Sequence, residues 1–589
     1  MFGDGRPQVG ALLLPSETGA ELSRNRAAYV EAVWPVIAAA NARAPSHSRL
    51  LPEMVEILAP GTEVPVATKM SILRPACYRK FAPIIDEVYR RFEGGSGAVE
   101  KRRIDGENEA ETYLLELLGR TLGSRAEGIT RETDLFAFGV DSLQATRVRN
   151  TAQKELDLGG ATLGQNVVYE YPSVSKLAEH ILAVASHSVH ANGTRSAYDE
   201  MEAMASKWAA RVVPATPGNR ASGNPVILVT GATGSLGAHA VACLLRRPDV
   251  RIICLSRAAS HADSRDRLAH SFALRRLEPD WSRISSYAGD LTLPDLGLGD
   301  ALADVRDSIT GVLHLAWPVN FAAALGSFEP SVAGTVNLLN LTQGSPLAPK
   351  PRFFFASSVG AVQAADAPTI MEDFSDQPAD AGATGYARSK WVVERVLAQT
   401  RGTVLRIGQL VGDSTHGVWN ETEAWPLMFR SAVSTGSLPA LEEEVGWLPV
   451  DQAGEAVAEA ALSPSGDGVL HILNRHTAPF ASILAGLRRA GVVFETVPRR
   501  EWLRRLAESD PDVAANPTRK LLPFYEGRIG GDVEKARPAF DARKAEERCQ
   551  VMRGLGPIDD GLVSKWAEVW RESGFFPPSS PVQPVQNGH

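Results

Sequence analysis

The sequence of 589 residues predicts three folded parts: a small α+β unit, a helical unit and a larger α/β unit with a parallel sheet. From Asn224 onward, apolar β-branched runs alternate with helical patterns, as in parallel strands joined by right-handed crossovers. Before that point, residues 187–223 are rich in Ser, Ala, Asn, Gly and Pro and predict a linker with one helix near 199–210. A polar connector at 94–105 divides the remaining N-terminal elements into two groups.

Composition narrows the classes of partner. Hydrophobic residues make up 44% of the chain, charged residues 22%, and the net charge is −8, which favours neither nucleic acid nor an anionic membrane. The four cysteines are scattered without metal or disulfide spacing, so we expect no metal site and a reducing compartment. No signal-peptide pattern and no apolar run of membrane-spanning length is present, so we expect a cytoplasmic protein.

The first part, residues 1–93, has predicted strands at 9–14 and 55–58 and predicted helices at 24–43 and 77–92. Its segment Thr68-Lys-Met-Ser-Ile-Leu-Arg74 resembles the T-x-K-G-S-x-x-R loop of the C-terminal subdomain of adenylate-forming enzymes, although Met70 stands where glycine is usual. In that family the lysine, here Lys69, reaches the acyl-adenylate; a solvated loop lysine is the alternative. The larger nucleotide-binding part of such enzymes is not in this sequence. We therefore expect Lys69 to catalyse nothing here, and an upstream adenylation core to be a partner.

The second part, residues 104–186, is predicted to be helical, with Tyr113, Leu114, Leu117 and Leu118 on one face of its first helix. The segment Asp134-Leu-Phe-Ala-Phe-Gly-Val-Asp-Ser-Leu143 resembles acyl or peptidyl carrier proteins, a four-helix family. The resemblance implies that Ser142 carries 4′-phosphopantetheine, added by a phosphopantetheinyl transferase. The alternative is that Asp141 or Ser142 only caps a helix.

The third part, residues 224–577, begins with a buried strand at 226–229, a glycine-rich turn and a helix that starts near Ser235. Glycines let a backbone approach a pyrophosphate, and a helix N-terminus offers free N–H groups to it. A tight turn without a ligand is the alternative. The candidate cofactor contacts in this turn are Thr230, Gly231, Thr233, Gly234, Ser235, Leu236 and Gly237.

The second strand, 250–255, is followed by Arg257. An acidic residue near this position would bind the ribose hydroxyl of NAD, whereas an arginine suits the 2′-phosphate of NADP. The sequence therefore predicts NADPH as the cofactor. Arg267 in the next helix either adds a second contact or lies on a solvated face.

A candidate acid/base pair follows the fifth strand, 352–356. Ser357 and Ser358 end that strand, and Tyr386 and Lys390 lie four residues apart on one helical face. This set resembles the short-chain dehydrogenases, which implies that Ser358, Tyr386 and Lys390 are catalytic, with Ser357 as an alternative serine. We expect the lysine ammonium to lower the pKa of the tyrosine and to hold the nicotinamide ribose.

The same resemblance implies further cofactor contacts. Asp290 and Leu291 follow the third strand, where the family places an aspartate against the adenine. The segment 313–321 resembles the family's H-N-A-A-x-V-N-F stretch beside the ribose. Leu315 replaces its asparagine, so only backbone contacts, such as that of Ala316, carry over.

The last third of the chain resembles thioester reductase domains. Val404–Asp413 matches their R-x-G-Q-x-x-G-D segment, and Trp447–Asp451 also recurs there. Residues 414–445 and 476–575 then form the expected substrate-capping subdomain, and 578–589 an expected disordered tail. Five aromatic residues either line an apolar pocket or belong to ordinary core: Trp317, Phe321, Trp419, Trp425 and Phe429.

The chain as a whole resembles the C-terminal part of fungal-type adenylation–carrier–reductase proteins, which include carboxylic acid reductases and aminoadipate-reductase-like synthetases. The resemblance implies that an acyl thioester on Ser142 is reduced by NADPH to an aldehyde, with Ser358 and Tyr386 stabilising the oxyanion. Four alternatives remain: a second reduction to the alcohol, Dieckmann-type release without redox, a nucleotide-sugar epimerase or dehydratase, and a non-enzymatic carrier scaffold. The sequence does not identify the acyl group.

Overall fold

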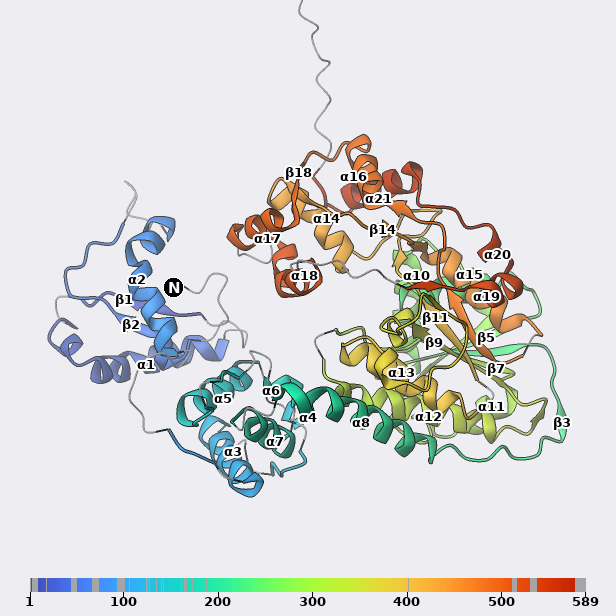
Figure 1. The fold of residues 1–589 in the computed structure, drawn as a ribbon, viewed down its shortest axis with the longest axis horizontal. Helices are drawn as coiled ribbons and strands as arrows, with labels where there is room; N and C mark the ends of the chain where they lie inside the picture. Colours follow the sequence, from blue (N-terminus) through green and yellow to red (C-terminus); the bar gives the residue numbers. More distant parts are fainter. Residues whose placement is uncertain are drawn as a thin grey trace, which may run out of the picture. The chain divides into compact units, whose positions relative to one another are not determined.

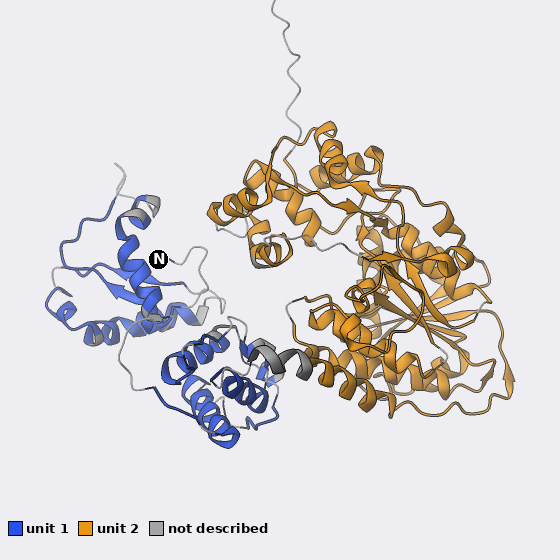
Figure 2. Ribbon diagram, viewed as in Figure 1, with its two compact units in different colours: residues 1–196 blue, residues 197–589 orange. Residues whose placement is uncertain are grey.

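The chain folds into two compact units in a computed structural model: residues 1–196 and residues 197–589 (Figures 1 and 2). The predicted tail, 578–589, lies outside the described residues. The structure describes residues 2, 9–16, 19–43, 50–65, 74–92, 101–104, 106–122, 126, 128–133, 135–138, 140, 142–159, 161–163, 167–171, 173–185, 189–321, 323–400, 402–464, 466–510, 516–529 and 538–577.

The first unit begins with a small α+β fold. Strand β1 (Ala11–Leu13) pairs in parallel with β2 (Val55–Ile57), and α1 (Arg26–Arg43) and α2 (Arg74–Phe92) complete it. Met54, Val88 and Tyr89 are almost fully buried in its core. The predicted α+β character of this part is confirmed.

The same unit continues into a helical bundle. It contains α3 (Glu107–Leu122), α4 (Leu135–Phe138), α5 (Ser142–Glu155), α6 (Val167–Glu170) and α7 (Val174–Ala185). Leu114, Leu117 and Leu118 of α3 are buried against Leu177 and Ile181 of α7 in one core. The apolar face predicted from the spacing is therefore the face that packs.

The second unit is built on a seven-stranded parallel sheet with the order β16-β11-β9-β7-β4-β5-β6. The strand order reverses between β4 and β7, and ligands of doubly wound sheets bind at such a reversal, beyond the carboxyl ends of the strands. The strands are β4 (Val226–Thr230), β5 (Arg251–Ser256), β6 (Ile284–Ala288), β7 (Gly311–His314), β9 (Arg352–Ser358), β11 (Gly402–Ile407) and β16 (Gly468–Ile472).

Helices cover both faces of this sheet (Figure 1). One apolar core includes side chains of α9 (Ser235–Leu244), α10 (His261–Leu274) and α15 (Val450–Leu462). The core on the other face includes α11 (Ala301–Ser308), α12 (Glu329–Gln343) and α13 (Gly385–Leu397). The predicted α/β fold with a parallel sheet is confirmed, and the sheet is doubly wound.

A capping subdomain has its own aromatic core. Its helices are α14 (Ala424–Ser434), α16 (Phe480–Arg489), α17 (Arg499–Glu508), α18 (Leu522–Ile529) and α21 (Asp560–Glu572). Strands β13 (Ser437–Ala440) and β18 (Glu495–Pro498) pair within it. Its core contains six tryptophans: Trp419, Trp425, Trp447, Trp502, Trp566 and Trp570.

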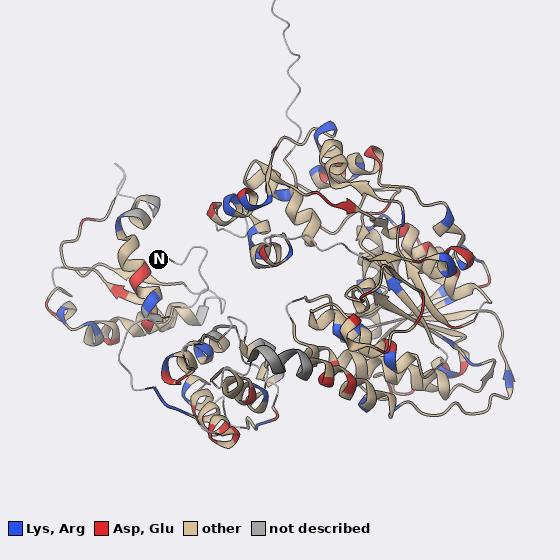
Figure 3. Cartoon of the chain, viewed as in Figure 1, with Lys and Arg blue, Asp and Glu red and all other residues tan. Residues whose placement is uncertain are grey.

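Charged side chains of both signs are interspersed along the helices of both units (Figure 3). On α17, for example, Arg504 and Arg505 both pair with Glu501 at 2.7 Å. These two basic residues are thus compensated within the capping subdomain.

One segment predicted as cap packs elsewhere. Helices α19 (Arg543–Arg548) and α20 (Gln550–Arg553) fall within the predicted range 476–575. However, Ala545, Cys549 and Met552 are buried in the sheet core beside α9 and α15. Their spacing of four and three residues places one apolar face on the sheet layer, so the chain returns there before α21 rejoins the cap.

The predicted linker also differs from the structure. Helix α8 (Val189–Ala209) extends through the range predicted as linker, and residues from Ala197 onward belong to the second compact unit. Met201, Met204, Ala205 and Trp208 are buried in the core that contains α12 and α13. These residues have helical i, i+3, i+4, i+7 spacing and lie in the helix predicted near 199–210, but the polar composition around them did not indicate that this helix packs on the second unit.

We expect Trp208→Ala to destabilise the second unit by about 3 kcal/mol, because it removes a buried indole. The indole nitrogen also donates to Glu329 Oε1 at 3.0 Å, and Arg211 lies 4.5 Å above the ring. Thermal unfolding of the full chain measures the effect, with Val213→Ala, an exposed site just beyond the helix, as the control. An unchanged transition in Trp208→Ala would show that the segment is a linker after all.

Candidate active site

The glycine turn between β4 and α9 is held by two close backbone approaches. Gly231 has φ +76°, and a Cβ there would lie 2.7 Å from the backbone nitrogen of Ala316. A Cβ on Gly237 would lie 2.2 Å from the carbonyl oxygen of Gly231. Helix α9 begins at Ser235 with Gly234 as its N-cap, which has no side chain to occupy the first amides. A dinucleotide pyrophosphate fits this cradle, because the backbone is uncovered where the phosphates need N–H donors.

A chain of buried hydrogen bonds joins this turn to β7, the neighbouring strand in the sheet. The amide of Ala316 donates to Thr230 Oγ1 (3.3 Å), and the Thr230 hydroxyl contacts His314 Nδ1 (2.7 Å). His314 Nε2 lies 3.1 Å from Thr335 Oγ1, whose own proton goes to the carbonyl of Ser331. Thr335 must therefore accept from His314, which assigns the proton to Nε2 and leaves Nδ1 to accept from Thr230.

The residues predicted to contact the ribose and adenine of the cofactor also lie close together. Arg257 is exposed directly after β5, and the Arg267 guanidinium reaches back from α10 to donate to the Arg257 backbone carbonyl. Asp290 Oδ1 accepts from the amide and the hydroxyl of Thr292, which lowers the pKa of Asp290, with Arg257 adding a smaller effect. Arg257 and Asp290 are thus close enough to interact, and Asp290 also shapes its own loop. The carbonyl of the neighbouring Leu291 accepts from Asn337 Nδ2.

The serine after β9 lies close to the tyrosine of α13. Ser358 Oγ accepts from the amide of Gly360 at 3.1 Å, and the hydroxyl is near enough to Tyr386 to lower the pKa of the phenol. Ser357 is buried and donates instead to Glu394 Oε1. Successive residues of a strand point to opposite sides, so only one of the two serines can face the tyrosine. The geometry favours Ser358 as the candidate catalytic serine.

Lys390 lies one helical turn beyond Tyr386 in an almost closed apolar site. The side chain is 2% exposed, and Nζ donates to the Ala356 carbonyl at 2.6 Å. The ammonium is 4.4 Å from the ring centre of Trp317 and 4.5 Å from that of Phe355. Burial lowers the pKa of Lys390 well below its ordinary value, while the nearby Glu394 carboxylate raises it.

The expected lowering of the tyrosine pKa is wrong in this structure. Burial raises the pKa of Tyr386 to about 12, and the nearby Ser358 hydroxyl opposes that rise. Desolvation disfavours the phenolate, and the Lys390 Nζ donates to a backbone carbonyl in place of the phenol. At neutral pH Tyr386 is therefore a fully protonated donor.

A buried ion pair joins helix α13 to strand β11. Arg406 of β11 donates from Nη2 to Glu394 Oε2 at 2.7 Å, and both side chains are at most 1% exposed. A second arginine nitrogen contacts His471 Nε2 at 3.1 Å, and His471 Nδ1 contacts the carbonyl of Asp541. The sequence contains one indication that Glu394 belongs to this site, because Glu394 follows Lys390 by four residues on the same helical face.

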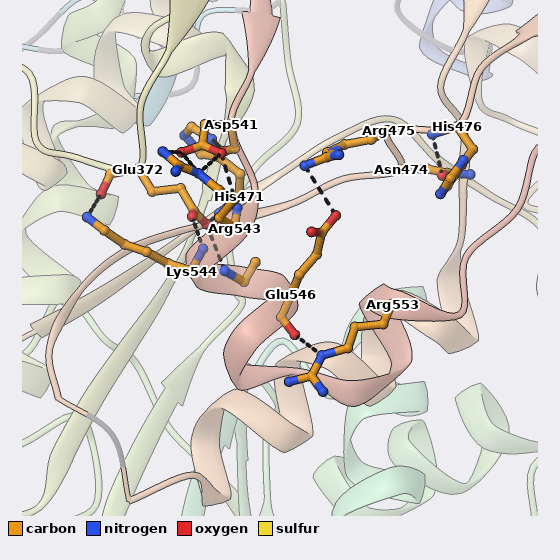
Figure 4. Close-up of polar contacts among 11 residues, drawn as sticks. Glu372, His471, Asn474, Arg475, His476, Asp541, Arg543, Lys544, Glu546 and Arg553 are labelled. Atoms are coloured by element: carbon orange, nitrogen blue, oxygen red, sulfur yellow. Dashed lines mark hydrogen bonds and ion pairs between the residues drawn. The ribbon is translucent and has the colours of Figure 1, made fainter.

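The region behind that pair is stabilised by Glu372 (Figure 4). Its carboxylate accepts from the His471 amide at 2.8 Å and from the amides of Lys544 and Ala545 in the first turn of α19. Lys544 Nζ donates in return to the carbonyl of Glu372 at 2.6 Å. A glutamate distant in sequence thus binds the N-terminus of α19, which explains why that helix packs on the sheet layer.

The two reductase-like segments meet at the junction of sheet and cap. Asp413 accepts from the amides of Thr415, His416 and Val418 at 2.6–3.1 Å. Asp451, from the second segment, accepts from the amide of Ser414 at 2.8 Å and from its hydroxyl. In this structure both aspartates therefore shape the loop that leads from the sheet into the cap.

The aromatic candidates separate into two groups. Trp419, Trp425 and Phe429 are buried among other rings of the cap core, so they are core residues and do not line an open pocket. Trp317 covers Lys390, and its Nε1 donates to Ser389 Oγ at 3.3 Å. Phe321 is 48% exposed and meets the ring of Tyr386 edge-on at 5.2 Å.

In the first unit, Ser142 is the first residue of α5, as expected for a helix start. Asp141 and Gly139 lie outside the described residues, as does Lys69. Among the described residues, no three His, Cys, Asp or Glu side chains are grouped as a metal site. None of the described helices has the length and apolar character needed to cross a bilayer.

Three domain families match the chain in sequence order. Residues 1–93 match the AMP-binding enzyme C-terminal domain, residues 112–181 the phosphopantetheine attachment site, and residues 229–457 the NAD-binding family described as male sterility protein. An adenylate-forming reductase of Heterobasidion annosum, Nps10, is 30% identical over 98% of this chain and 56% of its own length. A carboxylic acid reductase of Neurospora crassa is 27% identical over 97% of this chain and 57% of its own length.

The chain is thus similar to adenylate-forming reductases over almost its whole length. It spans somewhat more than half the length of these curated relatives. Among solved structures, the terminal R domain of the myxalamid pathway matches 65% of this chain and all of its own, with 25% identity and a TM-score of 0.56. An archaeal thiolation–reductase di-domain shares the fold over 81% of this chain, with 17% identity and a TM-score of 0.51.

We expect the second unit to lose stability in mild acid because His314 is buried in its neutral form. Complete burial lowers the pKa of His314 to about 3, and Lys390 adds to this effect. The unfolded chain, with a histidine pKa near 6.5, takes up the proton first as the pH falls. Stability is therefore lost from about pH 6.5 downward, by up to about 1.4 kcal/mol per pH unit.

Urea unfolding at pH 7 and pH 5 measures this loss. His314→Gln keeps one acceptor and one donor for Thr230 and Thr335, so its stability should fall less between the two pH values than that of the wild type. The exposed His270→Gln is the control and should retain the wild-type loss. The same loss in His314→Gln as in the wild type would contradict the assignment.

Proposed function

We propose that the chain reduces an acyl group, carried as a thioester on phosphopantetheine at Ser142, to an aldehyde with NADPH. The observation that carries the proposal is the grouping of Ser358 and Tyr386 with Lys390, at strand ends that only β7 separates from the dinucleotide cradle after β4. A phosphopantetheine attachment domain precedes this site in the same chain. Together they support a tethered substrate for the reductase, which requires an acyl donor and a phosphopantetheinyl transferase as partners.

The mechanism follows from what the side chains can donate. When bound, NADPH supplies the hydride to the thioester carbonyl carbon. Ser358 lies near enough to Tyr386 to affect its pKa, so we propose that one carbonyl oxygen accepts from both hydroxyls. These preorganised donors stabilise the negative charge that develops on that oxygen. Loss of the thiol from the resulting tetrahedral centre then releases the aldehyde.

Proton transfer is assigned to Tyr386. Because its pKa is raised to about 12, the hydroxyl is protonated at neutral pH and serves as a general acid. Lys390 lies 5.6 Å from the tyrosine ring and is held in place by the Ala356 carbonyl and the Trp317 ring. We assign Lys390 the positioning of the cofactor ribose and electrostatic assistance to the tyrosine.

The alternatives have weaker support. Release by Dieckmann-type cyclisation and a carrier scaffold require neither Tyr386 nor Lys390, whereas both are present, with the buried Lys390 Nζ 5.6 Å from the centre of the Tyr386 ring. An epimerase or dehydratase would not need the phosphopantetheine attachment domain. Of the two reductive outcomes, release of the aldehyde requires one hydride, and we propose that the reaction stops there.

The roles of the two serines give a matched pair of variants. With an acyl-pantetheine and NADPH, we expect Ser358→Ala to lower kcat about 10²- to 10³-fold, because it removes one oxyanion donor. Ser357→Ala should lower kcat far less, because that hydroxyl serves Glu394. Tyr386→Phe should abolish turnover. NADPH absorbance with aldehyde detection measures all three; a larger loss in Ser357→Ala than in Ser358→Ala would overturn the assignment.

Cofactor choice is tested at the end of β5. We expect Arg257→Ala to raise the KM for NADPH at least about tenfold and to leave the KM for NADH nearly unchanged, because only NADPH carries the 2′-phosphate. Arg251→Ala, an exposed arginine at the opposite end of the same strand, is the control. Equal effects on both cofactors would contradict the predicted NADPH specificity.

A further inference from the structure

The catalytic tyrosine has one exposed aromatic neighbour. The ring of Tyr386 meets Phe328 at 6.3 Å, Phe321 at 5.2 Å and the Lys390 ammonium at 5.6 Å. Phe328 and Lys390 are almost fully buried, whereas Phe321 is 48% exposed. Of these three neighbours, only Phe321 therefore borders the side from which a substrate can reach the tyrosine.

The position of Phe321 is set by a close backbone approach. A Cβ on Gly385, the residue before Tyr386, would lie 2.2 Å from the carbonyl oxygen of Ala323 and 2.6 Å from the carbonyl carbon of Ala324. The backbone just after Phe321 thus lies directly on the first turn of α13. This contact holds Phe321 beside the ring of Tyr386.

A second ring reaches the same place from the cap. Phe524 of α18 stacks on Phe321 with ring centres 6.0 Å apart and planes inclined by 25°. The next residue, Tyr525, anchors α18, because its hydroxyl donates to the Ala424 carbonyl at 2.6 Å and its ring meets Trp502 at 5.1 Å. Phe524, Phe321 and Tyr386 form a continuous column of rings from the cap core to the catalytic hydroxyl.

We propose that Phe321 and Phe524 form one wall of the acyl site and select planar aromatic acyl groups over saturated ones of equal carbon number. The inference rests on the proposed reduction at Tyr386. A planar acyl group can stack on these rings as they stack on each other, whereas a saturated ring of the same carbon number gains only the buried area. Aromatic stacking beyond area burial corresponds to about a fivefold gain in affinity.

Binding to the full chain without NADPH tests the wall. Calorimetry with benzoyl-pantetheine and cyclohexanecarbonyl-pantetheine compares two acyl groups with the same number of carbons. We expect the wild type to bind the benzoyl compound about fivefold more tightly. Phe321→Ala and Phe524→Ala should each bring the ratio close to one. Phe494→Ala, a part-buried cap ring that packs on Arg488 at 4.4 Å, should retain the wild-type ratio.

Two results would overturn the wall: equal affinities in the wild type, or a benzoyl preference that survives in both Phe321→Ala and Phe524→Ala. NADPH oxidation with the same two compounds separates this inference from the proposed function. A benzoyl preference in binding that the two variants lose, without NADPH oxidation by the wild type, would support the wall while the reduction fails. NADPH oxidation by the wild type, together with equal affinities for the two compounds, would overturn the wall and leave the proposed reduction standing.

Discussion

The buried ion pair between Arg406 and Glu394 is the contact on which the geometry of the active site depends. It joins helix α13 to β11, and Ser357 of β9 and His471 of β16 also hydrogen-bond to it. Leaving either charge alone in this interior would cost several kcal/mol, so the helix has one favourable position over the strand ends. Because Ser357 is turned toward Glu394, the next residue, Ser358, faces Tyr386. The same carboxylate is the charge that favours the protonated form of the desolvated Lys390.

Desolvation then sets the protonation behaviour of Tyr386 and Lys390. Trp317 and Phe355 enclose the Lys390 ammonium, and burial keeps Tyr386 protonated. A protonated tyrosine suits a reductase working toward an aldehyde, because the developing oxyanion needs a proton donor. The cofactor cradle is linked to this region by the buried Thr230–His314–Thr335 chain, and His314 stays neutral near the lysine because it too is desolvated. The two halves of the site are therefore connected by one layer of buried side chains above the strand ends.

The sequence predicted the features that local patterns encode. The glycine turn, the parallel strands and the Tyr386–Lys390 spacing are each readable from a few neighbouring residues, and the fold they predict is confirmed. What it could not predict depends on packing between distant segments. The four buried residues of α8 lie among polar ones, so composition there predicts a linker, and the apolar face of α19 is too short to indicate which layer it covers. The pKa of Tyr386 was predicted in the wrong direction, since its burial comes from segments far along the chain. The role of Ser142 stays a prediction, because its neighbour Asp141 lies outside the described residues.

Reduction of an acyl group carried on the chain itself is measured most directly by mass spectrometry of the full chain. A phosphopantetheinyl transferase and an acyl-coenzyme A would load Ser142, with Ser142→Ala as the unloaded control. On addition of NADPH, we expect the carrier to lose the acyl mass and return to the free thiol, with one aldehyde formed and one NADPH oxidised per chain. An acyl group that remains on the loaded chain, or leaves it without oxidation of NADPH, would contradict reductive release.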